Sequence, residues 1–294
     1  KFYNSQSGVY TSVSGGGGRQ SEQAMPLYYG LVPDGDEEKV AAVVAQSVKN
    51  DSYKIKTGEI ALKPVFMTLA QYGYNDVVGK MANQTDCPSY GYWVVQGYTT
   101  TPEYWDVGAF SQNHCMMDHI EEWFFTQLGG IQNIGMAFDK INISPYFPAD
   151  LNSSDSSTKC NYGTIRSAWQ RTTDGYKFQF TVPQGTEANI VVPISNGQVL
   201  KENRKEVSVG TAGIISVAYE DNKATIVVGG GKYEFTAGEG DIIEDTSGID
   251  EIKDKINSLN GKVYDLSGRL VSESSSRNLK SGIYIIDGHK RFVK

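Results

Sequence analysis

The sequence predicts a multi-domain α and β protein, with helices in the first part of the chain and sheets in the rest. Apolar residues recur every three or four positions up to about residue 130, which is typical of amphipathic helices. From about residue 140 apolar and polar residues alternate, which is typical of strands. The 294 residues are long enough for two domains or more, at about 100–200 residues per domain.

The expected helices are recognised by one-sided apolar spacing and by residues that begin or end a helix. Asp34 with Glu37 offers a capping box for the first helix, and Gly73 stands where the second should end. Short connections between successive helices imply antiparallel pairs, as in a bundle or an α/α barrel. The helices are expected at residues 33–50, 59–75, 75–84 and 113–130. The inward residues expected on the last of them are Met116, Ile120, Trp123, Phe124 and Leu128.

The expected strands are short, and turn-forming residues separate them. In residues 176–182 the aromatic and apolar side chains share one face. Asp221 and Asn222 are expected to form a hairpin turn. Such a series of strands is typical of a β-sandwich, with Trp169 in its core. The other strands are expected at residues 140–145, 163–169, 188–194, 206–210, 213–220, 224–229 and 232–237.

Composition and charge exclude several functions. The chain carries 27 Lys and Arg against 34 Asp and Glu, a net charge of −7, which leaves no basic surface for nucleic acid. No apolar run approaches the roughly 18–20 residues of a membrane span. No metal or other cofactor is expected, because His114 and His119 would point about 140° apart on a helix. Cys87, Cys115 and Cys160 form no CxxC pattern, so no disulfide framework is indicated, although one pair could still bridge.

The densest group of aromatic residues lies between residues 90 and 105. The rings follow neither a helical nor a strand period, and on a loop they could stack on the apolar faces of sugars. Glu103, between Pro102 and Tyr104, is the kind of carboxylate that can activate a water against a sugar carbon. From the residues alone, an aromatic packing cluster with an exposed Glu remains the alternative. The rings are Tyr90, Tyr92, Trp93, Tyr98, Tyr104 and Trp105.

Several segments together resemble the C-terminal half of bacterial α-L-rhamnosidases, glycoside hydrolase family 78. They are SEQAMPLYYGLVPDG, KTGEIALKPVFMTLAQYGYNDVVGKMANQTDCPSYGYWVVQGYTTTPEYWD, NHCMMDHIEEWFF, INISPYFP, YGTIRSAW and FTVPQGTEANIVVP. The resemblance extends from about Arg19 to about Pro193. It implies the last part of an (α/α)6 barrel closed by a β-sandwich. It also implies an inverting hydrolase that removes terminal α-L-rhamnose from glycans or glycosides.

The resemblance carries individual roles onto this sequence. The family's TT-x-x-E-x-W pattern stands here in TTTPEYW, residues 99–105, so that Glu103 takes the role of the general base. The Asn-His pair that opens the next helix is Asn113 and His114, and the family's histidine there contacts the rhamnose. Trp105 and Tyr92 are expected as walls of the sugar pocket.

The chain also departs from the family pattern. The acidic cluster that holds the family's general acid has no equivalent here, whereas an inverting glycosidase needs two carboxyl groups about 6.5–9.5 Å apart. The His-Leu-x-Thr-Gly motif reads KIKTG at residues 54–58, and Asp118 replaces a glycine. We therefore expect the chain to be the later part of a larger enzyme, inactive without its N-terminal half.

The end of the chain has a resemblance of its own. NGKVYDLSGRLV and LKSGIYIIDGHKRFVK look like a type A C-terminal sorting domain of the type IX secretion system. This implies a secreted or cell-surface protein, associated with the outer membrane of a bacterium. A small β module for carbohydrate or protein contact is the alternative.

The expected domain boundaries follow from these changes in pattern. They are residues 1–137 for the barrel part, 138–237 for the sandwich, 238–260 for a linker and 261–294 for the sorting domain. The glycine-rich residues 12–20 lack the Lys-Ser/Thr of a phosphate loop and are expected to be a loop or turn. Two other functions stay open, namely another (α/α)6 glycosidase and a non-catalytic surface glycan-binding protein.

Overall fold

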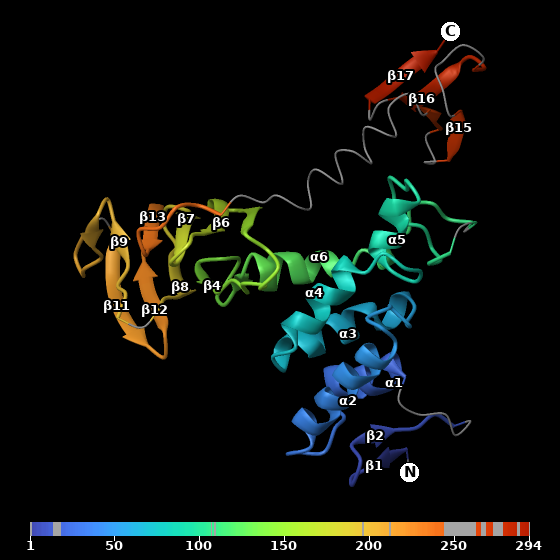
Figure 1. The fold of residues 1–294 in the computed structure, drawn as a ribbon, viewed down its shortest axis with the longest axis horizontal. Helices are drawn as coiled ribbons and strands as arrows, with labels where there is room; N and C mark the ends of the chain where they lie inside the picture. The colour runs from blue at the N-terminus through green and yellow to red at the C-terminus, as the bar shows by residue number, and fades with distance from the viewer. Residues whose placement is uncertain are drawn as a thin grey trace. The chain divides into compact units, whose positions relative to one another are not determined.

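A computed structural model describes most of the chain, which mixes helices with several sheets (Figure 1). The described residues are 2–13, 19–106, 108, 110–195, 197–211, 213–243, 263–265, 269–272, 279–286 and 289–293. Contacts divide the chain into one unit of residues 1–120 with 247–294 and a second unit of residues 121–246. Among the described residues, no helix combines the length and the apolar character needed to cross a bilayer.

The first unit begins with a small hairpin and continues with helices whose buried faces pack on one another. The helix α1 packs against both α2 and α3, and α3 packs against α4. Of the four valines whose spacing predicts one face of this helix, Val40, Val44 and Val48 are buried and Val43 is half-buried, which confirms α2. The elements are β1 (Tyr3–Asn4), β2 (Val9–Tyr10), α1 (Gln20–Tyr28), α2 (Glu37–Asn50), α3 (Glu59–Gln71), α4 (Asn75–Asn83) and α5 (Tyr90–Val95).

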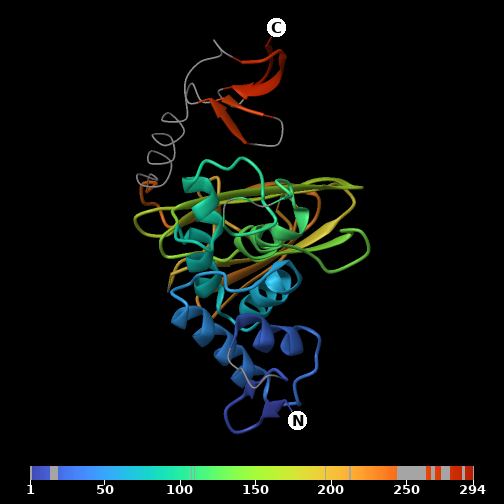
Figure 2. The same cartoon turned by 90° about the vertical axis from the view of Figure 1, so that its right-hand side faces the viewer.

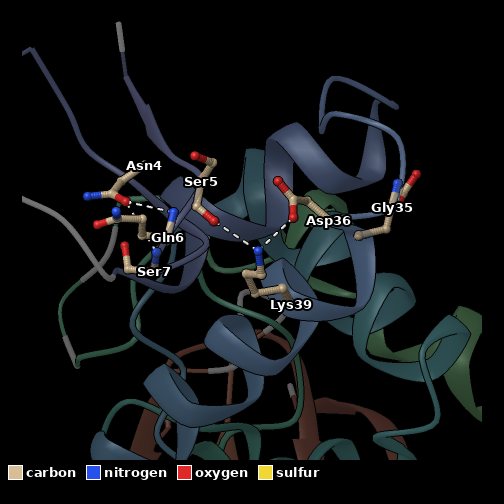
Figure 3. Close-up of polar contacts among 8 residues, drawn as sticks. Asn4, Ser5, Gln6, Ser7, Gly35, Asp36 and Lys39 are labelled. Atoms are coloured by element: carbon tan, nitrogen blue, oxygen red, sulfur yellow. Dashed lines mark hydrogen bonds and ion pairs between the residues drawn. The ribbon is translucent and has the colours of Figure 1, made fainter.

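The start of α2 differs from the prediction. The capping residue is Asp36 and not Asp34, so the expected capping box is wrong. The Asp36 carboxylate instead accepts from Lys39 Nζ at 2.7 Å, which lowers the pKa of Asp36. The same ammonium donates to the Ser5 carbonyl at 2.8 Å (Figure 3). Lys39 therefore ties the first hairpin to the start of the helix.

The end of α3 agrees with the prediction. Gly73 has a φ of +82°, a conformation that glycine adopts without strain. The Gly73 and Tyr74 amides donate back to the carbonyls of Ala70 and Leu69, which closes the last turn.

The single helix expected over residues 113–130 is wrong. The structure has a 3-10 turn, η1 (Cys115–Met117), then the short helix α6 (Ile120–Trp123) and a π-helical segment, η2 (Phe124–Leu128). Helical structure is interrupted at Asp118 and His119, where the Asp118 carboxylate accepts from Thr101 and the neighbouring Met117 carbonyl accepts from Tyr90. Of the residues expected to point inward, Ile120 and Trp123 are buried, whereas Met116 and Phe124 are 41% and 38% exposed.

The second unit holds a six-stranded and a five-stranded sheet, which Figure 2 shows from a second direction. Their strand orders are β10-β9-β13-β7-β6-β5 and β11-β12-β8-β4-β3, and every pairing is antiparallel except that of β4 with β8. Buried side chains from both sheets form one core, to which β6 contributes Trp169, as predicted. The strands are β3 (Ile131–Asn133), β4 (Lys140–Ile143), β5 (Ser153–Cys160), β6 (Gly163–Arg171), β7 (Tyr176–Val182), β8 (Glu187–Pro193), β9 (Lys201–Glu202), β10 (Lys205–Glu206), β11 (Ile214–Glu220), β12 (Lys223–Val228) and β13 (Gly231–Ala237).

Three parts of the sheets test the sequence pattern, with different outcomes. Asp221 and Asn222, both with positive φ, form the predicted turn between β11 and β12. The edge strand β5 has the sequence SSDSSTKC, and the prediction missed it because it lacks alternating apolar residues. The strand expected at residues 206–210 does not form beyond Glu206, although the Val207 amide still donates to the Leu200 carbonyl in the register of β9 and β10.

The last described residues form an antiparallel sheet in the order β15-β14-β16-β17, where short strands were expected. Its strands are β14 (Val263–Tyr264), β15 (Leu270–Ser272), β16 (Gly282–Ile286) and β17 (His289–Val293). Most of the expected linker, at residues 244–260, and the glycine-rich residues 14–18 lie outside the described residues.

Candidate functional site

The segment that carries Glu103 and His114 is a loop closed by backbone hydrogen bonds. The His114 amide donates to the Thr101 carbonyl at 2.7 Å, and the Glu103 amide donates to the Ser111 carbonyl at 3.1 Å. At the base of this loop, Thr101 Oγ1 donates to Asp118 Oδ2 at 3.2 Å. These contacts hold the backbone of Glu103 in place. They also bring two residues that are 11 positions apart in sequence onto the two arms of one turn.

Trp105 is anchored to the body of the helical unit by its ring and by its backbone. Its ring stacks on Trp93, with centroids 4.6 Å apart and an interplanar angle of 18°. Its indole Nε1 donates to the Thr57 carbonyl at 2.9 Å, and its own carbonyl accepts from Trp93 Nε1 at 3.0 Å. Trp93 is buried and Trp105 is half-buried, so a part of the Trp105 side chain still faces outward.

The Tyr90 ring packs edge-on against both tryptophans, with ring centroids 5.6 Å apart for Trp93 and 5.2 Å apart for Trp105. Burial raises the pKa of its phenol, and the hydroxyl donates to the Met117 carbonyl. Tyr90 and Trp93 lie on the short helix α5, so the expectation that no helix forms in the aromatic segment is wrong. The segment is thus a packed aromatic cluster at its base, and Trp105 lies at its half-exposed edge.

His114 pairs with a residue that the sequence reasoning missed. Its Nε2 lies 2.6 Å from Glu59 Oε2, and both side chains are about one-third exposed or less, at 26% for His114 and 35% for Glu59. Glu59 is the first residue of α3, directly after the motif at residues 54–58 that departs from the family pattern. No spacing rule connects residues 55 positions apart, so only the position of Glu59 at the start of a helix could have drawn attention to it.

The remaining predicted residues lie on the same unit. Tyr92 is half-buried on α5, where its amide donates to Ser89 Oγ at 3.0 Å, and Asn113 is exposed on the loop. Glu103 is half-buried, and among the described residues its carboxylate has no ion-pair or hydrogen-bond partner. Two other carboxylates bond to the loop, and both are engaged, Asp118 by Thr101 and Glu59 by His114. Among the described residues the loop therefore offers two carboxylates without a partner, the half-buried Glu103 and the exposed Asp106, and the assigned roles stay predictions.

Metal and disulfide chemistry have no visible centre in this part of the molecule. Within the described ranges, no group of three or more His, Cys, Asp or Glu side chains is arranged to hold a metal ion. Cys87, Cys115 and Cys160 are all free thiols.

Two family domains match the chain in succession. Residues 1–128 match the bacterial alpha-L-rhamnosidase 6 hairpin glycosidase domain, and residues 130–206 match the bacterial alpha-L-rhamnosidase C-terminal domain. The boundary between the two matches lies close to the boundary at residues 120 and 121 between the two compact units.

Proteins similar to this chain are also named alpha-L-rhamnosidases. An alpha-L-rhamnosidase of Streptomyces avermitilis is 26% identical over 230 residues, which are 75% of this chain and 22% of that protein. An alpha-L-rhamnosidase of Formosa agariphila is 24% identical over 228 residues, which are 74% of this chain and 24% of that protein. The chain thus spans about a quarter or less of the length of these relatives.

Solved structures share the fold. The structure of alpha-L-rhamnosidase from Dictyoglumus thermophilum superimposes with a TM-score of 0.67 and 27% identity, over 77% of this chain and 26% of that one. The crystal structure of Streptomyces avermitilis alpha-L-rhamnosidase complexed with L-rhamnose gives a TM-score of 0.66 and 23% identity, over 77% of this chain and 22% of that one.

Proposed function

We propose, from the premise that residues 1–128 and 130–206 are the two successive domains of a bacterial α-L-rhamnosidase, that the whole protein is an inverting α-L-rhamnosidase. Its substrate would be a glycan or glycoside with a terminal α-L-rhamnose. The observation that carries the proposal is the half-buried carboxylate of Glu103, which has no partner within the described part of the chain and lies on a loop whose backbone is fixed at both arms. The helices α1 to α5 would be a part of the (α/α)6 barrel, and the two sheets of residues 131–237 would be the β-sandwich that closes it.

In this proposal Glu103 is the general base. A base must hold a water molecule in one orientation toward the anomeric carbon, which requires a fixed backbone and a carboxylate without a competing partner. The contacts of Thr101, Ser111 and Trp105 supply the first condition. The absence of a partner for the Glu103 carboxylate among the described residues supplies the second. His114, Asn113, Trp105 and Tyr92 would bind the sugar.

The second carboxyl group of the inverting reaction would come from outside residues 1–294. The relatives are about four times longer than the matched region, so they have ample chain to provide a general acid. The two further carboxylates that bond to the loop already hold Thr101 and His114. We therefore propose that a missing N-terminal half of the same enzyme supplies the acid and that residues 1–294 alone are inactive.

Two measurements test this function. The whole protein and residues 1–294 would each be incubated with 4-nitrophenyl α-L-rhamnoside, and the first sugar released would be followed by proton NMR. We expect turnover by the whole protein only, with β-L-rhamnose appearing before its anomer because the reaction inverts the configuration. Release of α-L-rhamnose first, or turnover by residues 1–294 alone, would contradict the proposal.

We also propose that residues 261–294 are a type IX secretion sorting domain, which would make the protein secreted or bound to the cell surface. The support is the sequence resemblance together with the small sheet β14–β17. Deletion of residues 261–294 in the native bacterium should retain the protein in the periplasm. Unchanged export of the shortened protein would exclude this role.

A further inference from the structure

The hydrogen bond between Glu59 and His114 joins two distant parts of the sequence at the loop. Glu59 Oε2 and His114 Nε2 are 2.6 Å apart, and the two residues are separated by 55 positions. An ionised carboxylate can only accept hydrogen bonds, so Nε2 must be the donor in this contact. Nε2 of His114 therefore carries a proton as long as the pair is intact.

The position of Glu59 at the start of a helix is favourable for a carboxylate side chain. It is the first residue of α3, a helix of 13 residues, and its own backbone lies among the unpaired amides of the first turn. The positive end of the helix dipole favours a negative side chain there. A charged acceptor makes a stronger hydrogen bond than a neutral one, so the imidazole ring is held in one orientation.

The start of α3 also holds the other end of the loop. The Thr57 carbonyl accepts from Trp105 Nε1, two residues before Glu59 accepts from His114. Thr57 and Glu59 thus contact Trp105 and His114, which follow Glu103 in the same segment. A Cβ added to Gly58 between them would meet nothing within 4 Å, so this position can be changed without disturbing either contact.

We propose that Glu59 is a positioning residue that binds His114 through Nε2 and leaves Nδ1 as the ring nitrogen that meets the sugar. In the neutral ring, Nδ1 then has no proton and accepts a hydrogen bond from a sugar hydroxyl. The part of this inference that concerns the sugar rests on the proposed function. The part that concerns the ring of His114 does not.

The ring can be examined directly in residues 1–294 labelled with 15N-histidine. Long-range proton–nitrogen spectra report which ring nitrogen carries the proton, and a His114→Asn variant identifies the signals of His114. We expect Nε2 to be protonated in the unmodified chain and in Glu59→Gln, whose amide oxygen still accepts. In Glu59→Ala the Nε2 proton should exchange with water at least about 10-fold faster, because it loses its acceptor. A ring protonated only at Nδ1 in the unmodified chain, or an exchange rate that Glu59→Ala leaves unchanged, would overturn the proposal.

Activity of the whole protein separates positioning from folding. Loss of one hydrogen bond to a charged group should raise KM for 4-nitrophenyl α-L-rhamnoside by about 10-fold in Glu59→Ala, with a smaller change in kcat. Glu59→Gln should recover most of this loss, and Gly58→Ala should stay close to the unmodified protein. A matched control is Asp86→Asn, which removes an exposed carboxylate 3.5 Å from Lys54 in the same unit.

The two readouts fail independently of each other. A whole protein without rhamnosidase activity would refute the proposed function, while the NMR spectra would still decide whether Glu59 holds His114. An active protein in which Glu59→Ala keeps the KM of the unmodified enzyme would refute the positioning role alone. Thermal unfolding of each variant checks that Glu59→Ala remains folded.

Discussion

The two-sheet core and the loop of residues 99–114 are held in place in different ways. The two sheets share a continuous core, built from alternate side chains of their strands. Backbone hydrogen bonds pair each strand with its neighbours in the sheet. The loop instead depends on individual contacts. They are two backbone hydrogen bonds between its arms, the stacking of Trp105 on Trp93, and side-chain contacts with Thr57, Glu59 and Asp118. The region that carries the candidate chemistry is thus held by separate interactions, whereas the two sheets share one core.

The largest expected change in stability comes from the sheet core. Phe178 on β7 is 1% exposed, and Phe178→Ala should lower the free energy of unfolding by about 3–5 kcal/mol because it leaves a cavity. Hydrogen exchange of the β6 and β7 amides measures this loss. Lys177→Ala, an exposed change on the same strand, should stay within about 0.5 kcal/mol of the unmodified chain. Equal losses in the two variants would break the comparison.

Removal of the Trp105 hydrogen bond should cause the next largest loss of stability, and this loss should be confined to the loop. Trp105→Phe deletes the hydrogen bond to Thr57 and leaves that carbonyl without its partner, at a cost of about 1–3 kcal/mol. Exchange of the Trp93 indole proton, which binds the Trp105 carbonyl, should become at least about 10-fold faster. The exposed neighbour change Tyr104→Phe serves as the control. An unchanged exchange rate in Trp105→Phe would show that stacking alone anchors the loop.

The hydrogen bond between Thr101 and Asp118, at the base of the loop, should stabilise the loop less than the Trp105 anchor does. Thr101→Val removes the hydroxyl that donates to Asp118, a hydrogen bond worth about 0.5–1.5 kcal/mol. The His114 and Glu103 amides should then exchange faster, whereas Thr99→Val, a change at an exposed position, should leave them unaffected. Protection that persists in Thr101→Val would mean that the backbone bonds hold the loop without Asp118.

The smallest change in the free energy of unfolding is expected from a surface ion pair on the six-stranded sheet. Arg166 donates to both Asp155 oxygens at 2.8 and 2.7 Å, which lowers the pKa of Asp155. Because the pKa of Asp155 is lowered in the folded state, the ion pair stabilises the fold at a pH above the unfolded-state pKa of about 4. This stabilisation is lost as the pH falls through the folded-state pKa. Because Asp155 is 59% exposed, we expect at most about 1 kcal/mol. Urea unfolding of the unmodified chain and of Asp155→Asn should differ at pH 6 and converge near pH 2.

Sequence patterns predicted the elements that depend on local or periodic information. The apolar face of α2, the glycine at the end of α3 and the Asp221-Asn222 turn each follow from residues within a few positions of one another. The patterns could not predict β5, because an edge strand rich in serine is paired on one side only and needs no apolar alternation.

The candidate site likewise combines residues that a local motif reveals with a contact that it does not reveal. Glu103 and His114 were found by their place in a motif, but the partner of His114 was not, because contacts across 55 residues leave no trace in local spacing. The helix expected from residue 113 failed for a related reason. The apolar spacing does not reveal the contacts of Met117 with Tyr90 and of Asp118 with Thr101, which lie where the expected helix is interrupted.

The role of Glu103 is the central claim, and its replacement in the whole protein tests it most directly. We expect Glu103→Gln to lower kcat for 4-nitrophenyl α-L-rhamnoside by about 100- to 10,000-fold, with little change in KM, because the water loses its base. Glu121→Gln, an exposed change on α6, is the matched control. A Glu103→Gln enzyme that keeps kcat within about 10-fold of the unmodified protein would contradict the account, since a general base contributes more than that.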